Sequence, residues 1–179
     1  MDTKLLRETF ERARKENGGT TSLGMRFYAR LFEKYPAVRP LFTTPPEEQH
    51  KKLMASLGSI ISAVENPVAL VPFLHAMGIR HLKYKTENAH YAAVEENLIA
   101  VLAEHLSKEG QWSKEMDSAW QEALQTVSHI MIEGANNPEL YADELQKSGY
   151  EPDGFSKRTK EPWKMPDPTG SVATTSTTA

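Results

Sequence analysis

The sequence predicts an all-α fold in a single domain, and two observations carry that prediction. Apolar residues recur at intervals of three and four through six successive segments, as they do on the buried face of a helix. No segment alternates apolar and polar residues over the length of a strand, and no internal repeat is visible. The length of 179 residues suits one domain with a substantial buried core.

Glycines and prolines set the boundaries of the first two predicted helices. The first apolar stripe ends by residue 17, before the Gly18-Gly19 pair, and the second covers residues 20–35. A proline disfavours the helical conformation of the residue before it, so Pro36 ends the second helix. The chain from there to Phe42 is predicted to form a short irregular turn.

The remaining four predicted helices follow one another with short connections. Thr44 as N-cap, Pro45 at the first helical position and Glu47 in a capping box start the third helix. It stops at Asn66, and a proline restarts a fourth helix. The apolar residues of the fifth and sixth lie between Tyr91 and Leu102 and between Ser113 and Gly134.

The composition changes after the sixth helix, which divides the chain into three parts. Residues 1–135 form the predicted domain, and residues 136–150 form a short extension with a helix over 138–147. Residues 151–179 are rich in Pro, Asp, Lys, Thr and Ser. Such a segment buries too little apolar surface to order itself, so we expect a largely disordered tail.

Composition excludes several classes of function. A net charge of -3 argues against a nucleic-acid surface, which is normally strongly basic. No apolar run approaches the roughly 18 to 20 residues of a membrane span. The absence of cysteine excludes disulfides, iron–sulfur clusters and cysteine-bound zinc. The charged N-terminus lacks the apolar centre of a signal peptide, so we expect a cytoplasmic protein.

His81 is the candidate metal ligand. It follows Met77 by four residues on the apolar face of the fourth helix, which also carries Leu70 and Leu74. At this spacing one ring nitrogen can donate to the Met77 carbonyl, which leaves the other nitrogen free to bind a metal. The same spacing also fits a buried structural histidine that bonds only to the backbone.

The other five histidines are weaker candidates, and no two histidines have the i, i+4 spacing of a helical metal pair. His50 points about 100° away from its neighbour Gln49 on a helix, which argues against a role beside it. His90 is expected to face outward or to cap a turn. The remaining three are expected at the surface or the edge of the core: His75, His105 and His129.

Five groups of residues resemble those of bacterial single-domain haemoglobins and of the globin domain of flavohaemoglobins. They occur in order and with matching spacing from about Lys4 to Gly134. The groups are residues 27–42 (FYARLFEKYPAVRPLF), Glu48-Gln49 followed by Leu53, Arg80-His81, Ala89-His90-Tyr91 and Ala119-Trp120. The resemblance implies a globin fold of six main helices and a short turn, packed around one haem b.

The resemblance also implies roles for individual residues. His81 corresponds to the proximal ligand of the haem iron, and Tyr91 to the residue beside it. Phe42 corresponds to the phenylalanine that stacks on the porphyrin. Tyr28 and Gln49 correspond to the hydrogen-bond donors of the distal pocket.

Further contacts with haem are implied for six residues. Leu53 corresponds to the apolar wall of the distal pocket, four residues after the distal glutamine. Met77, Val94 and Leu98 are expected to touch the ring or its ligand. Lys52 and Arg80 are the candidates for the two haem propionates.

Each of these residues also has an ordinary structural interpretation. Phe42 fits the core, and the Tyr28 hydroxyl could bond to a backbone carbonyl. Gln49 and Lys52 could lie on a solvated helix face, as such residues usually do.

The implied function is reversible O2 binding with high affinity and slow release. Oxidation of NO to nitrate is a further activity of flavohaemoglobins, which carry a fused flavin reductase. Only about 45 residues follow Gly134, so such an activity would require a separate reductase. The family also places a glutamate near the end of the last helix, where this chain has Ala135. Glu133 lies roughly 200° around the helix from that position and should not replace it.

Two other classes of function fit parts of the sequence. In a gas sensor, binding of O2 or NO would change the contacts of the extension and the tail. In a haem-free interaction module, nothing would require His81, Phe42 and the Tyr28–Gln49 pair to occur together.

Overall fold

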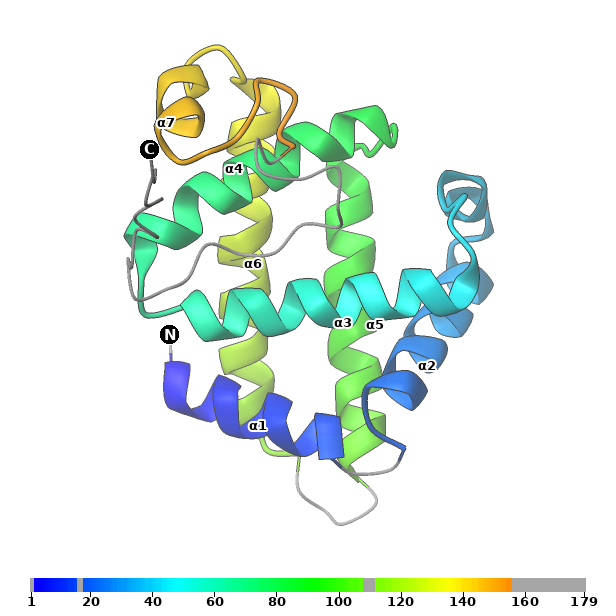
Figure 1. The fold of residues 1–179 in the computed structure, drawn as a ribbon. Helices are drawn as coiled ribbons and strands as arrows, with labels where there is room; N and C mark the ends of the chain where they lie inside the picture. The colour runs from blue at the N-terminus through cyan, green and yellow to red at the C-terminus, as the bar shows by residue number, and fades with distance from the viewer. Residues whose placement is uncertain (1, 16–17, 108–111, 156–179) are drawn as a thin grey trace, which may run out of the picture.

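The structure is a computed structural model that describes residues 2–15, 18–107 and 112–155. Figure 1 shows the helices in chain order. They are α1 (Thr3–Lys15), α2 (Gly19–Lys34), the 3-10 helix η1 (Pro36–Leu41), α3 (Pro46–Ala63), α4 (Pro67–Lys83), α5 (Asn88–Leu106), α6 (Lys114–Asn136) and α7 (Ala142–Lys147). The predicted all-α fold with six main helices and one short turn is confirmed. None of these helices is long and apolar enough to cross a membrane.

The helices pack as two groups that share α6. The helix α4 lies against α6 over much of its length, whereas α2 packs on α5 and α3. The helix α1 crosses one end of the molecule and contacts α2, α3, α5 and α6. This arrangement leaves the C-terminal end of α4, which carries His81, away from α1.

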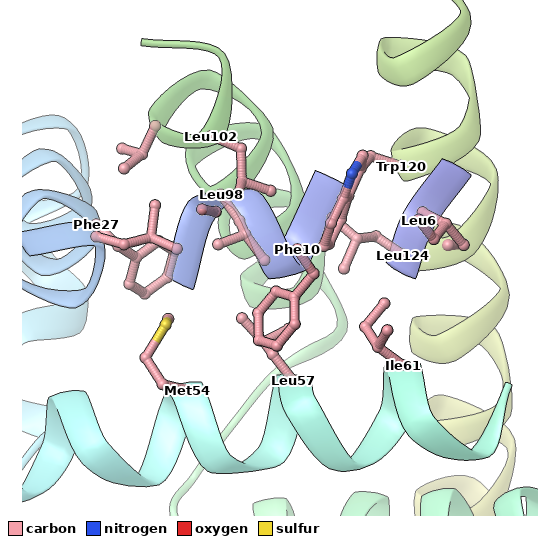
Figure 2. Packing of buried hydrophobic residues seen from close by; sticks show 14 of the residues in the cluster. Leu6, Phe10, Phe27, Met54, Leu57, Ile61, Leu98, Leu102, Trp120 and Leu124 are labelled. Atoms are coloured by element: carbon pink, nitrogen blue, oxygen red, sulfur yellow. The ribbon is translucent and has the colours of Figure 1, made fainter. Parts of the chain in front are cut away.

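The buried apolar residues form two clusters. The larger cluster joins α1, α2, α3, α5 and α6, and Figure 2 shows part of it: Leu6, Phe10, Phe27, Met54, Leu57, Ile61, Leu98, Leu102, Trp120 and Leu124. The smaller cluster surrounds α4, where it includes Phe73, Leu74 and Met77. Leu145 and Tyr150, from the C-terminal segment, complete this second cluster.

The start of α3 differs from the prediction. The helix begins at Pro46, and Pro45 takes the N-cap position without a side-chain cap, so the predicted capping box of Thr44 and Glu47 is wrong. The cause is the second proline, because its ring disfavours a helical conformation at Pro45. Pro45 therefore adopts an extended conformation, with φ -52° and ψ 141°.

The packed C-terminal segment extends further than predicted. The helix expected over 138–147 is limited to Ala142–Lys147. Residues 150–155 then turn back onto α4, and Gly149 and Gly154 take the positive φ angles that these turns require. The predicted disordered tail began at residue 151, and its part from 156 to 179 lies outside the described residues.

Two glycines allow α4 and α6 to approach closely. A Cβ atom on Gly78 of α4 would collide with the backbone of Met131 on α6. A Cβ atom on Gly134 of α6 would lie 2.6 Å from the Cα of His75 on α4. Backbone touches backbone at both points, so the position of α4 depends on the absence of these side chains.

We predict that Gly78→Ala lowers the free energy of unfolding by at least about 1–3 kcal/mol, because the helices must separate to admit a methyl group. Gly58→Ala on α3 is the matched control, since its Cβ would lie 3.6 Å from the Phe10 ring, an ordinary contact. Alanine favours a helix over glycine by about 1 kcal/mol, so this control should be neutral or stabilised. Urea unfolding measures both, and parental stability of Gly78→Ala would contradict the close packing of α4 on α6.

Candidate functional site

His81 lies in the last turn of α4, where its ring is fixed by the backbone. Its Nδ1 lies 2.7 Å from the carbonyl oxygen of Met77, and a carbonyl can only accept, so Nδ1 carries the proton. The Nε2 lone pair is then available to a metal. Burial lowers the pKa of His81 from its ordinary value, although the bond to Met77 opposes this shift. The imidazole is therefore neutral at neutral pH, as a metal ligand must be.

Two tyrosines surround the His81 ring. The ring centroid of Tyr84 lies 5.6 Å away, edge to face, and that of Tyr91 lies 6.2 Å away with the planes tilted by 34°. Burial raises the pKa of Tyr91 to about 12, which keeps its hydroxyl protonated. The Glu133 carboxylate instead accepts a hydrogen bond from Tyr141 at 2.5 Å. The prediction that Glu133 does not take the position of a proximal glutamate agrees with this contact.

Tyr28 and Gln49 meet between α2 and α3. The Nε2 of Gln49 donates to the Tyr28 hydroxyl over 3.1 Å. The Tyr28 side chain is buried, and in the described part of the chain its own hydroxyl proton has no acceptor. Burial raises the pKa of Tyr28 to about 12, with a smaller opposing effect of the bond from Gln49. The pair therefore holds a protonated hydroxyl that is available to donate.

Aromatic rings enclose the Tyr28 ring on several sides. Phe42 lies edge to face at 5.4 Å, and Phe32 packs against both rings, at 5.7 Å from Tyr28 and 5.3 Å from Phe42. His50 stacks on Tyr28 at 5.3 Å with only 22° between the planes. These neighbours restrict rotation of the Tyr28 ring and so fix the direction of its hydroxyl.

His50 is a site residue that sequence reasoning set aside. The helical angle between it and Gln49 is real, but both side chains reach Tyr28 because α2 crosses α3 at this point. Gly24 marks the crossing, since its Cβ would lie 3.0 Å from the Cβ of His50. A glycine four residues before Tyr28 was the available signal, because glycine permits close approach of two helices.

The other predicted haem contacts divide between the two apolar clusters. Leu98 belongs to the larger cluster, and half-buried Leu53 and Val94 pack against it. Met77 belongs to the smaller cluster, and Tyr91 packs against that one. The boundary between the clusters therefore separates the residues around Tyr28 from those around His81.

The two predicted propionate contacts lie in different environments. Lys52 is exposed on α3, where a charged group from solvent can reach it. The Arg80 guanidinium instead lies 5.7 Å from the centroid of the Phe155 ring. Burial lowers the pKa of Arg80, with opposing effects from Tyr84, Tyr150 and Asp153.

Two further histidines are buried, so their predicted place at the surface or core edge is wrong. His105 fills the core between helices, with Nε2 3.0 Å from the Ala13 carbonyl oxygen. His75 lies beneath α7, with Nδ1 2.9 Å from a carboxylate oxygen of Glu144. His129 is exposed, as expected, and His90 caps α5 by accepting from the backbone of Glu87 at 3.0 Å.

Comparisons with known proteins agree on one family. A sequence profile described as Globin matches residues 25–131. A globin-like protein of Aquifex aeolicus, itself uncharacterised, is 29% identical over 118 residues, which cover 66% of this chain and 81% of that protein. A flavohemoprotein of Halalkalibacterium halodurans is 27% identical over 110 residues, or 60% of this chain. The chain spans only 26% of that flavohemoprotein.

A solved structure shares the fold. It is an engineered carbene transferase derived from RmaNOD, a proposed nitric oxide dioxygenase of Rhodothermus marinus. The two structures superpose with a TM-score of 0.65 at 26% sequence identity. The match covers 79% of this chain and 94% of the other.

Proposed function

The chain belongs to the globin family, and from that premise we propose that it holds one haem b through His81 and binds O2 reversibly. Members of this family bind haem. The observation that carries the proposal is the bond from His81 Nδ1 to the Met77 carbonyl. It fixes the tautomer in which Nε2 can coordinate iron.

The residues present fit haem by their chemistry. The His81 imidazole contacts Met77 and Tyr91, which belong to or pack on the smaller cluster. The Gln49 amide bonds to the Tyr28 phenol of the larger cluster. A planar apolar ring bound by His81 would contact both clusters, with Phe42 among the residues that cover it. Lys52 is the basic residue that we assign to a propionate, because it is exposed and Arg80 packs on Phe155.

When bound, haem would supply an iron that can hold a diatomic gas. Tyr28 and Gln49 would then decide which gas is held. A protonated Tyr28 hydroxyl would stabilise the negative charge that O2 gains when it is held in this way. Hydrogen bonds to charged groups contribute about 1.5–3 kcal/mol each, which corresponds to a dissociation constant about 10- to 150-fold lower. We therefore assign slow O2 release and high affinity to this pocket.

A second activity, the oxidation of NO to nitrate, is favoured by the fold shared with RmaNOD and by the Tyr28–Gln49 pair. The net reaction joins one NO and one O2 and consumes one electron to give nitrate. That electron needs a donor, and we propose a separate flavin reductase. Ala135 leaves Tyr91 without the carboxylate of the family pattern, which argues against a peroxidase-like role.

We predict that His81→Ala with added hemin gives an altered iron spectrum, and that imidazole in solution restores the parental spectrum by replacing the lost lone pair. His129→Ala is the control, because it removes an exposed histidine of α6. Absorption spectra of ferric, ferrous and O2-bound forms measure the effect. A parent protein that stays colourless with excess hemin would refute the proposed function, as would an unaltered spectrum of His81→Ala.

We predict that Tyr28→Phe accelerates O2 dissociation at least several-fold and changes CO dissociation less, because CO gains little charge. Tyr35→Phe is the matched control, since Tyr35 follows the end of α2 and its hydroxyl bonds to Glu96 at 2.8 Å. Stopped-flow displacement measures both gases. Equal O2 rates in parent and Tyr28→Phe would remove Tyr28 from the binding of O2.

We predict that the protein with a flavin reductase and NADH produces many equivalents of nitrate from NO in air, and that Tyr28→Phe slows this turnover. Nitrate is measured against protein after successive additions of NO. A yield that stops at one equivalent per haem, with the reductase still active, would limit the function to gas binding.

A further inference from the structure

Residues 141–155, which we name the C-terminal strap, lie against α4 (Figure 1) and contact His75 and Arg80 of that helix. We propose that this strap is a positioning element for His81, and that its docking on α4 sets the proximal geometry and thereby the release of the gas. The proposal rests on the proposed function, because it assigns a consequence to the position of the haem ligand.

A polar group docks the start of the strap at His75. The ring of Tyr141 stacks on the His75 ring at 3.8 Å, and its hydroxyl donates to Glu133 of α6. The His75 Nδ1 meets Glu144 of α7 at 2.9 Å, and its Nε2 lies 4.0 Å from Glu133. His75 is almost fully buried, whereas the carboxylates of Glu133 and Glu144 are partly exposed, so these contacts join α4, α6 and α7 around one buried imidazole at the edge of the core.

The middle of the strap is part of the core around α4. Leu145 is fully buried, and Tyr150 is 2% exposed. Gly154 then brings backbone against backbone, because a Cβ there would collide with the Ala76 carbonyl oxygen. Its φ of +82° also favours glycine. The middle of the strap is therefore packed as part of the core.

The end of the strap contacts the last two turns of α4. The Phe155 ring lies 5.7 Å from the Arg80 guanidinium and 5.0 Å from the Lys83 ammonium. Lys83 also bonds to Asp153 at 2.7 Å. A half-exposed ion pair contributes little by itself, but the two cations and the ring fix one register of strap and helix.

The residues of α4 that contact the strap lie before and after His81 in the sequence. Ala76, Arg80 and Lys83 follow one another at intervals of four and three, so they form a stripe on α4 that faces away from His81. The Met77 carbonyl that orients the imidazole lies within this stretch. A packed interface does not deform gradually, so release of the strap would let this part of α4 shift together with the ligand.

The test compares four proteins reconstituted with hemin: the full chain, residues 1–155, residues 1–137 and the full chain with Gly154→Val. Valine at 154 introduces both a collision and an unfavourable φ. Lys147→Ala is the control for a substitution within the strap, because Lys147 is exposed and its loss should not undock the strap. Leu6→Ala is the control for lost stability far from α4, because it removes a fully buried side chain of α1.

The iron–histidine stretching band of the ferrous form and the O2 dissociation rate are measured on every protein, and amide exchange of residues 142–155 is measured on those that contain these residues. We expect Gly154→Val and residues 1–137 to shift and broaden the band and to change O2 release several-fold. Residues 1–155, Lys147→Ala and Leu6→Ala should keep the parental band. Should residues 1–137 not fold, the valine variant decides.

Two outcomes overturn the proposal. One is a parental iron–histidine band and O2 rate in Gly154→Val with its strap exchanging freely. The other is full protection of residues 142–155 in that variant, since the close contact at Gly154 would then not dock the strap. Failure of the proposed function looks different, because the full chain itself would then bind no hemin.

Discussion

The hydrogen bond from His81 to the Met77 carbonyl is the constraint on which the site depends. The two residues are one helical turn apart, so any rotation or fraying of α4 changes the direction in which Nε2 points. The position of this candidate ligand is therefore fixed only as well as the helix that carries it. The close contacts of Gly78 and Gly134 between α4 and α6 therefore belong to the site as much as the imidazole does.

Burial shifts the pKa values of His81 and Tyr28 in opposite directions, but in both cases it favours the uncharged form of the side chain. It lowers the pKa of His81 and raises the pKa of Tyr28 to about 12, so both groups are neutral at neutral pH. A pocket without fixed charge responds to charge that the ligand acquires. The unshared proton of Tyr28 is thus the group through which the proposed pocket distinguishes O2 from CO.

Periodicity predicted the helices because each one buries a single apolar face, and it predicted the His81 bond because both partners lie on one helix. Contacts between segments that are distant in the chain were harder to predict from the sequence. His50 reaches Tyr28 at the helix crossing marked by Gly24, and His75 is covered by segments distant in the sequence, among them α6, Tyr141 and α7. The start of α3 was missed for a local reason, since the second of two prolines excluded the predicted cap. The roles of the individual haem contacts remain predictions.

The proximal side shows how a shift of two residues along α6 redirects a polar group. The resembled family has a glutamate where this chain has Ala135, whereas Glu133 faces Tyr141 and His75 beneath the strap. The Glu133 carboxylate contacts Tyr141 and His75, and Ala135 provides no carboxylate at the position that the resemblance implies. If His81 binds iron, its properties in this chain are then set by the packing of α4 and the strap, and less by a charged partner.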